Sequence, residues 1–195
     1  SILCAEHRFN VSPSTPRTIT SSLSDLDGRT PGALASLKGP LHGGANEAVM
    51  HMMKEIGKPE NAKAWIENAL DKKKVVMGFG HRDYRTGDSR VPTMKHYMFK
   101  VAKLLKKEKY TRMYEILEKV MIDKKNIHPN VDFPCGPTYY MMGIDIDFYT
   151  PIFVMSRITG WSAHIMEQHT SNKLIRPLSK YRGAEVREVM LLNQR

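Results

Sequence analysis

The sequence predicts an all-α fold, and three observations support this prediction. Residues 93–107 and 111–123 place methionine, leucine, isoleucine and valine side chains at the spacing of one helix face. A third stretch is strongly apolar and begins at Pro151, in the first turn, where a helix accepts proline. No stretch alternates apolar and polar residues over the length of a strand. We therefore expect helices joined by loops rich in glycine and proline.

Little regular helix is expected before residue 40. Pro13 and Pro16 make a regular helix unlikely over the first 22 residues, or kink it. Residues 23–40 begin like a loop, because they contain the turn dipeptides Asp-Gly and Pro-Gly. The other expected helices are 43–57, 60–72, a short one at about 137–143, and the apolar one from 151 to about 168. Prolines make 127–137 a loop, and the tail from 171 is polar.

The composition limits the classes of function. The 195 residues carry a net charge of +10, and 41% of them are hydrophobic, which is typical of a globular protein with a buried core. No run of 18 apolar residues occurs, so no membrane-spanning helix is expected. Cys4 and Cys135 show no pairing pattern, which is typical of a reducing compartment.

The positive charge could serve nucleic acid or an anionic small substrate. The lysines lie on or beside helical segments and most often form a solvated face. The arginines stand in glycine-rich, proline-flanked or apolar contexts, and these candidates for function are Arg82, Arg85, Arg90, Arg157 and Arg176. A basic helical module that binds nucleic acid or a protein partner is the alternative, although aromatic residues are not interleaved with the basic ones.

Residues 38–46, Lys-Gly-Pro-Leu-His-Gly-Gly-Ala-Asn, place His42 in a turn that leads into a helix. The first N–H groups of a helix carry partial positive charge, which disfavours the cationic form of a histidine. A neutral His42 could donate a hydrogen bond to an oxygen that gains negative charge. The alternative is an ordinary surface histidine in a glycine turn.

Two further loops carry candidate groups. In residues 78–90, glycines would let backbone N–H groups approach an anion, and Arg85 and Arg90 could bind a phosphate or carboxylate; the alternative is a flexible basic loop. The other loop holds Asp132, which alone is more often a turn aspartate. No metal is expected, because the histidine spacing matches no ligand motif.

Two loop histidines, one loop aspartate and several arginines together suggest the enolisation of a thioester, followed by carbon–carbon bond formation to a polycarboxylate. In this chemistry a carboxylate removes an α-proton and a neutral histidine stabilises the enolate. A second histidine protonates the carbonyl of the electrophile, and arginines hold its carboxylates.

Five ordered motifs then resemble the citrate synthase family over nearly the whole chain. They are Ala5–Asn10, Leu37–Asn46, Met77–Arg90, Asn130–Phe133 and Leu174–Pro177. Three segments look most like 2-methylcitrate synthases of bacterial type, namely Asp88–Lys95, Pro134–Tyr140 and Phe153–Trp161. The resemblance implies an all-α, two-domain helical fold with the N-terminal part of the large domain absent. Segments 1–45 and 141–195 would belong to the large domain, and 46–140 would be the small domain that binds coenzyme A.

The resemblance also implies an activity. An acyl-CoA, propionyl-CoA or also acetyl-CoA, would condense with oxaloacetate, and hydrolysis would give 2-methylcitrate or citrate plus CoA. The alternatives are a citrate synthase of the tricarboxylic acid cycle and a non-catalytic fragment. The resemblance implies a homodimer in the cytoplasm or, alternatively, in the mitochondrial matrix. It implies no cofactor, because the coenzyme A thioester is a substrate. No nucleic acid and no membrane are expected as partners.

The resemblance assigns roles to single residues. Asp132 would take the α-proton of the acyl-CoA, His42 would stabilise the enol, and His81 would protonate the carbonyl oxygen of oxaloacetate. Oxaloacetate would be held by His7, His81, Arg90, Arg157 and Arg176, the last of which would reach the site of the partner subunit. Coenzyme A would be held by Leu41, Val75, Val76, Met77, Gly78, Phe79, Arg85 and Asn130.

The sequence departs from the family pattern in two ways. Prolines and glycines within 11–16 and 25–32 stand where the family usually has a smooth helix, and a proline in a helix interior costs roughly 3 kcal/mol. It stays open whether those helices are broken here. Arg8 stands beside His7, where the family usually has a small or acidic residue, and a cation there would lower the pKa of His7.

Overall fold

The structure is a computed structural model that describes residues 2–6, 10–39, 42–81, 84, 86–186 and 189–194. The α-helices in these ranges are α1 (Val11–Ser21), α2 (Leu26–Leu37), α3 (Ala45–Ile56), α4 (Pro59–Asp71), α5 (Val91–Leu104), α6 (Lys109–Lys125), α7 (Asp132–Met141) and α8 (Tyr149–Thr170). Three short 3₁₀ helices are η1 (Ile2–Cys4), η2 (Ile146–Phe148) and η3 (Leu192–Gln194). The described ranges contain no β-strand, so the all-α prediction is confirmed. None of the described helices has the length and apolar character that a membrane span needs.

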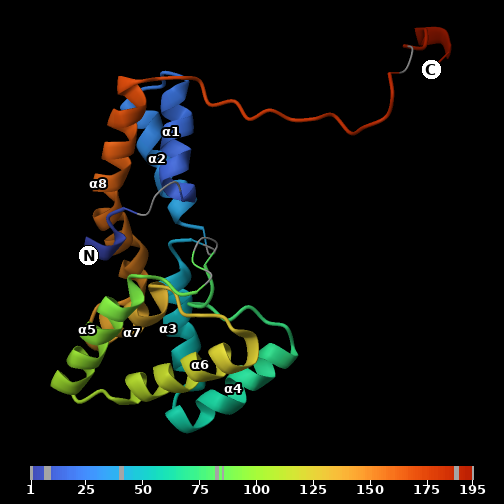
Figure 1. Cartoon of the computed structure of the whole chain (residues 1–195). Coiled ribbons are helices and arrows are strands. Elements are labelled where there is room, and N and C mark those ends of the chain that lie inside the picture. Colours follow the sequence, from blue (N-terminus) through green and yellow to red (C-terminus); the bar gives the residue numbers. More distant parts are fainter. Residues whose placement is uncertain are drawn as a thin grey trace.

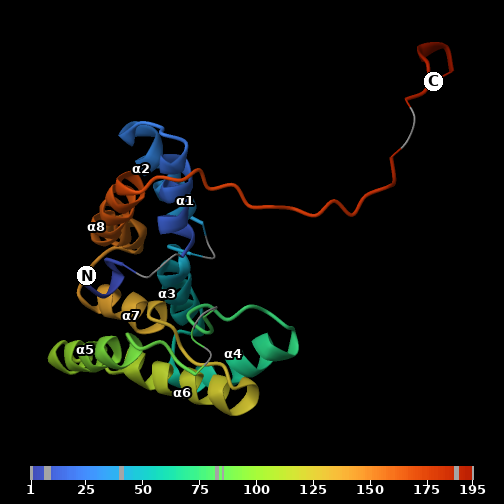
Figure 2. The ribbon, with the colours of Figure 1, turned by 45° about the horizontal axis from the view of Figure 1, so that its top comes forward.

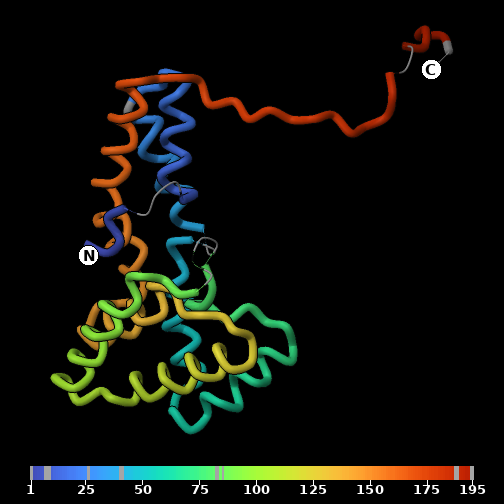
Figure 3. The backbone as a smooth tube through the Cα atoms, viewed as in Figure 1, coloured from blue at the N-terminus to red at the C-terminus, as the bar shows by residue number. Residues whose placement is uncertain are grey.

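The helices form two groups, which Figures 1 and 2 show from two sides. Helices α1, α2 and α8 pack against one another, while α3 to α7 form the second group. Each group has its own hydrophobic cluster, and α8 contributes to both, because Tyr149 lies in the cluster of the second group and Trp161 in that of the first. After α8 the chain leaves the helices as an extended tail, which the tube in Figure 3 makes clear.

The expectation of little regular helix before residue 40 is wrong, because α1 and α2 are both regular. Each helix has a side-chain cap: Asn10 accepts a hydrogen bond from the N–H of Ser12 at 3.1 Å, and Asp25 accepts one from the N–H of Gly28 at 2.9 Å. Pro13 lies in the first turn, where its missing N–H costs nothing. The interior prolines of the two helices are tolerated because packing of the helices against each other outweighs the lost bonds.

The sequence predicts a turn at Gly32, but Gly32 lies within α2 and packs closely against α1. A Cβ atom at Gly32 would stand 2.4 Å from Cδ1 of Ile19, which is far inside van der Waals contact. The missing side chain therefore lets the two helices pack closely.

The helices expected after residue 43 are present, with ends shifted by a few residues. The largest shift concerns α7, which begins at Asp132 and not at about 137. The sequence predicts a loop at Pro134, but Pro134 lies in the first turn of α7, where proline is compatible with the helix. Asp132 is consequently the first residue of a helix, and the helix N-terminus contributes to its electrostatic environment.

Candidate active site

A cavity of about 980 Å³ lies between the two helix groups. Its walls come from α1, from the start of α3, from residues 75–81, from the start of α7 and from α8. The polar side chains that line it include those of Asn10, His42, His81, Arg90, Asn130, Asp132 and Arg157. A cavity of this size suits an organic ligand rather than a single ion.

A short pairing of two loops joins the glycine loop that leads to His81 to the segment that precedes Asp132. The N–H of Gly80 donates to the carbonyl of His128 at 2.8 Å, and the N–H of Asn130 donates to the carbonyl of Gly78 at 2.9 Å. The side-chain amide of Asn130 adds a bond to the carbonyl of Gly80 at 2.9 Å. Gly78 has a φ of +85°, a conformation that favours glycine. The pairing fixes the glycine loop against the start of α7.

Asp132 combines a helix N-terminus with burial. Its N–H donates to Oδ1 of Asn130 at 3.1 Å, and the dipole of α7 favours its ionised form. Burial has the larger effect and raises the pKa of Asp132 to about 7. Cys4 and Asp88 act in the same direction, whereas Arg90 and Arg157 lower the pKa. A carboxyl group with a pKa near 7 can accept a proton and return it at neutral pH.

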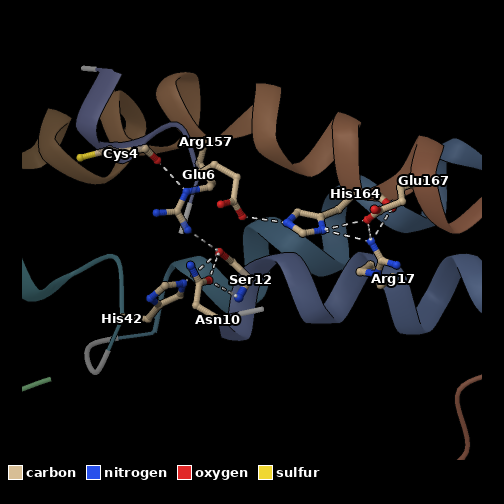
Figure 4. A network of polar contacts seen from close by, with 9 residues as sticks. All are labelled: Cys4, Glu6, Asn10, Ser12, Arg17, His42, Arg157, His164 and Glu167. Atoms are coloured by element: carbon tan, nitrogen blue, oxygen red, sulfur yellow. Dashed lines mark hydrogen bonds and ion pairs between the residues drawn. The ribbon is translucent and has the colours of Figure 1, made fainter. Parts of the chain in front are cut away.

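His42 is held by a residue that sequence reasoning missed. Its Nε2 lies 2.9 Å from Oγ of Ser12, and Oγ of Ser12 also lies 3.4 Å from Nη1 of Arg157 and 3.1 Å from Oδ1 of Asn10 (Figure 4). The ring of Phe153 meets the imidazole edge-on at 6.3 Å between centroids. His42 precedes the first turn of α3, as the sequence predicted.

Arg157 is a buried cation without a carboxylate partner in the described part of the chain. Its side chain is 1% exposed, and it donates from Nε to the carbonyl of Cys4 at 2.6 Å and packs over the ring of Phe153. Burial lowers its pKa. The resemblance implies that Arg157 holds oxaloacetate, and the cavity leaves room for an anionic ligand beside it.

Arg90 is paired with Asp88, a second residue that sequence reasoning missed. Nη2 of Arg90 lies 2.7 Å from Oδ2 of Asp88, and Nε lies 2.9 Å from Oδ1. Among the described residues, none bonds Nη1 of Arg90. No group of three or more possible metal ligands occurs in the described ranges.

The segment before the site is anchored by a polar network between η1, α1 and α8 (Figure 4). Nε2 of His164 lies 2.7 Å from Oε1 of Glu6, and Nδ1 of His164 lies 3.1 Å from Nη1 of Arg17. Arg17 also forms an ion pair with Glu167. Glu6 immediately precedes His7, so the network fixes where the chain enters the region of the cavity.

The structure brings together most, but not all, of the residues that the sequence singled out. The backbone cradle expected for coenzyme A lines the cavity, namely Val75, Val76, Met77, Gly78, Phe79 and Asn130. Arg176 lies on the exposed tail and does not line the cavity. His7, Leu41 and Arg85 lie outside the described residues.

A family model described as "Citrate synthase, C-terminal domain" matches residues 1–178 of the chain. The chain belongs to the citrate synthase family. It is 52% identical to 2-methylcitrate synthase 1 of Corynebacterium glutamicum over 194 residues, which cover 100% of this chain and 51% of that protein. It is 56% identical to 2-methylcitrate synthase of Mycobacterium tuberculosis H37Rv over 186 residues, which cover 95% of this chain and 47% of the relative. The expected resemblance to 2-methylcitrate synthases is thus confirmed.

Solved citrate synthases share the fold. The structure superimposes on citrate synthase from Thermotoga maritima with a TM-score of 0.85 and 37% identity, over 99% of this chain and 54% of that one. The TM-score is also 0.85, at 37% identity, for a Thermoplasma acidophilum citrate synthase in ternary complex with carboxymethyl coenzyme A and oxaloacetate; that match covers 99% of this chain and 53% of the other. The chain spans about half the length of the relatives and structures that it matches.

Proposed function

We propose that the protein carrying this chain condenses an acyl-CoA with oxaloacetate and hydrolyses the product to release CoA. One observation carries the proposal: His42, His81, Arg90, Asp132 and Arg157 line one cavity. These are the groups that enolisation and condensation require, and the family membership points to the same reaction.

In the proposed mechanism Asp132 is the base. Its pKa of about 7 makes it a stronger base than an exposed aspartate, because burial leaves the carboxylate poorly solvated. The ionised group removes the α-proton of the acyl-CoA, and the electron pair of the broken C–H bond moves to the thioester oxygen. That oxygen gains negative charge, which must be stabilised as it forms.

His42 would donate a hydrogen bond to the thioester oxygen. In the structure the one hydroxyl proton of Ser12 is directed at Oδ1 of Asn10, which can only accept. When the hydroxyl turns this proton to Nε2 of His42, the proton of the neutral imidazole resides on Nδ1, which can then donate to the substrate.

His81 would protonate the carbonyl oxygen of oxaloacetate as the enol carbon attacks. Arg90 and Arg157 would hold the carboxylates of oxaloacetate, together with His7 and with Arg176 of the partner subunit in a homodimer. The backbone of residues 75–79, with Leu41, Arg85 and Asn130, would hold coenzyme A. Water then hydrolyses the thioester, and CoA leaves.

The proposal also covers the domain division, the acyl donor and the compartment. We propose a large domain built from 1–45 and 141–195 and a small domain at 46–140 that closes over the substrates. The presence of two hydrophobic clusters supports two domains, although Met141, Ile146 and Tyr149 join the cluster of the small domain. Propionyl-CoA is the acyl donor that we propose, because the relatives named above are 2-methylcitrate synthases. One methylene changes binding by only ~1–3 kcal/mol, so acetyl-CoA should also react. The cytoplasm, as the compartment, stays a prediction.

The test is an assay of CoA thiol release by the complete natural polypeptide that carries this sequence. Propionyl-CoA and oxaloacetate together should release thiol, and acetyl-CoA should do so at a different rate. Reactions without oxaloacetate serve as the control for simple thioester hydrolysis. If neither acyl-CoA releases thiol in an oxaloacetate-dependent way, the proposed reaction is wrong.

A further inference from the structure

Asp88 is a buried carboxylate to which the proposed mechanism gives no role. It is 3% exposed and lies two residues before Arg90, in the segment that leads into α5. An ionised carboxylate is costly to bury unless cations and hydrogen-bond donors compensate for the lost water. The donors that surround Asp88 therefore indicate what the carboxylate does.

These donors belong to two separate parts of the candidate site. Oδ1 of Asp88 accepts from the backbone N–H of Arg90 at 3.0 Å and from its Nε at 2.9 Å. Oδ2 accepts from Nη2 of Arg90 at 2.7 Å and from the backbone N–H of Val131 at 3.1 Å. Val131 is 43 residues away in the sequence and directly precedes Asp132. One side chain thus joins the arginine to the helix start that carries the base.

The geometry of these bonds restrains both partners. The bidentate contact fixes the plane of the Arg90 guanidinium and leaves Nη1 outside the ion pair. The bond to Val131 fixes the first turn of α7, in which Asp132 is the first residue. A shift of about 1 Å in such a group can cost ~100-fold in rate.

We propose that Asp88 is a positioning residue of the condensation, which holds the oxaloacetate-binding Arg90 and the proton-abstracting Asp132 in one geometry. This inference rests on the proposed function. It adds a residue that contacts neither substrate and acts through two residues that do.

The negative charge of Asp88 also contributes to the electrostatic potential at Asp132. Burial alone would raise the pKa of Asp88, but its hydrogen bonds from Arg90 outweigh burial and hold that pKa below its usual value. Asp88 therefore stays ionised, and its negative charge contributes to the raised pKa of Asp132. The other groups that act on Asp132 are Cys4, Arg90 and Arg157, and the buried thiol of Cys135 lies one helical turn further along α7.

The experiment compares Asp88→Asn with Asp88→Glu in the complete natural polypeptide. Asparagine keeps the size of the side chain and removes its charge, whereas glutamate keeps the charge and displaces it by one methylene. Glu118→Gln is the matched control, because Glu118 forms an ion pair with Lys95 at 2.6 Å between α5 and α6 and does not line the cavity. The readouts are kcat, the KM for oxaloacetate, the pH dependence of kcat and the thermal unfolding temperature.

For Asp88→Asn we expect kcat to fall ~100-fold and the KM for oxaloacetate to rise about tenfold. The acid limb of its pH profile should move to lower pH, because a negative charge near Asp132 is lost. Asp88→Glu should lose kcat while its acid limb stays at the wild-type position. A purely structural role would lower the unfolding temperature without moving the acid limb.

The proposal is overturned if Asp88→Asn keeps kcat and KM within about twofold of wild type, or if its acid limb does not move. If Asp88→Asn does not fold, hydrogen exchange of wild-type protein decides: the Val131 amide should exchange slowly, and fast exchange would contradict the bond to Asp88. A wild-type protein that releases no thiol contradicts the proposed function instead, so the two failures are distinguishable.

Discussion

The hydroxyl group of Ser12 connects three polar residues that line the cavity. It is fully buried, and its hydroxyl contacts His42, Arg157 and Asn10 at once. Removing the hydroxyl would leave the Nε2 of His42 and the Nη1 of Arg157 without this partner. An unmatched polar group in a buried site is costly, and here it would also release the imidazole from its orientation.

We therefore expect Ser12→Ala to lower kcat by roughly 10- to 100-fold while the protein remains folded, because the tautomer of His42 is no longer fixed. Steady-state kinetics and circular dichroism measure the two effects. Ser162→Ala is the matched control, since the hydroxyl of Ser162 bonds only within α8 and is exposed. Equal kinetics for the two variants would mean that Ser12 does not orient His42.

The ionisation of Asp132 with rising pH should have opposite effects on activity and on the stability of the fold. Its pKa is about 7 in the folded chain and 3.8 ordinarily, so the unfolded chain binds fewer protons between these values. Stability from this group is therefore lost as pH rises from about 4 to about 7. In the proposed mechanism the ionised form of Asp132 is the base, so kcat should rise over the upper part of the same interval.

Replacing Asp132 by Asn should abolish nearly all turnover, leave oxaloacetate binding largely intact and stabilise the fold above pH 7. The gain should be at most roughly 4 kcal/mol at pH 8 and should vanish near pH 4, where the wild-type carboxyl is protonated. Thermal unfolding at both pH values and calorimetric titration with oxaloacetate measure these effects. A variant that kept the wild-type rate would refute the assignment of the base.

Several elements could be predicted from the sequence because their signal is local. The periodic apolar residues of α3 to α6 and of α8 predicted those helices, and the motifs named His42, His81 and Asp132. Helices α1 and α2 were missed because their prolines are unfavourable locally, while the caps and the mutual packing that offset them are visible only in three dimensions. Ser12 and Asp88 were missed for the same reason: their partners lie 30 and 43 residues away.

The packing of α1 on α2 gives a prediction about Gly32. Gly32→Ala should destabilise the fold by about 1–3 kcal/mol, because the new Cβ would overlap Cδ1 of Ile19. Adding Ile19→Val removes that Cδ1 atom and should restore part of the loss. Urea unfolding of both single variants and the double variant measures the coupling. Additive losses in the double variant would contradict the proposed contact.

The whole molecule presents its cavity between two groups of helices, with Arg176 on a tail that leaves both (Figure 1). In the proposed homodimer, each site combines Asp132 of one subunit with Arg176 of the other. This arrangement can be tested without a structure of the dimer. It requires that two variants, each inactive alone, regain activity when they form mixed dimers.

Asp132→Asn and Arg176→Ala should each be nearly inactive alone. After unfolding and refolding together, about half of the dimers are mixed, and each mixed dimer has one intact site of two, so about a quarter of the wild-type activity should return. Ultracentrifugation verifies that both variants are dimers. No recovery from dimeric mixtures would place Arg176 in the site of its own subunit, or in neither.

Helix α8 connects the two hydrophobic clusters, so a small rotation at one end displaces the other end. Its 22 residues span roughly 33 Å, with Tyr149 anchored in one core and Trp161 in the other. If α8 pivots at Tyr149 by about 5°, its far end at Thr170 moves ~3 Å, whereas Arg157, about a third of the way along, moves only ~1 Å. The part of α8 that lines the cavity would thus move about a third as far as the end that carries the tail. A small adjustment around the cavity would thus be magnified where the tail leaves the helices, toward the second subunit of the proposed homodimer.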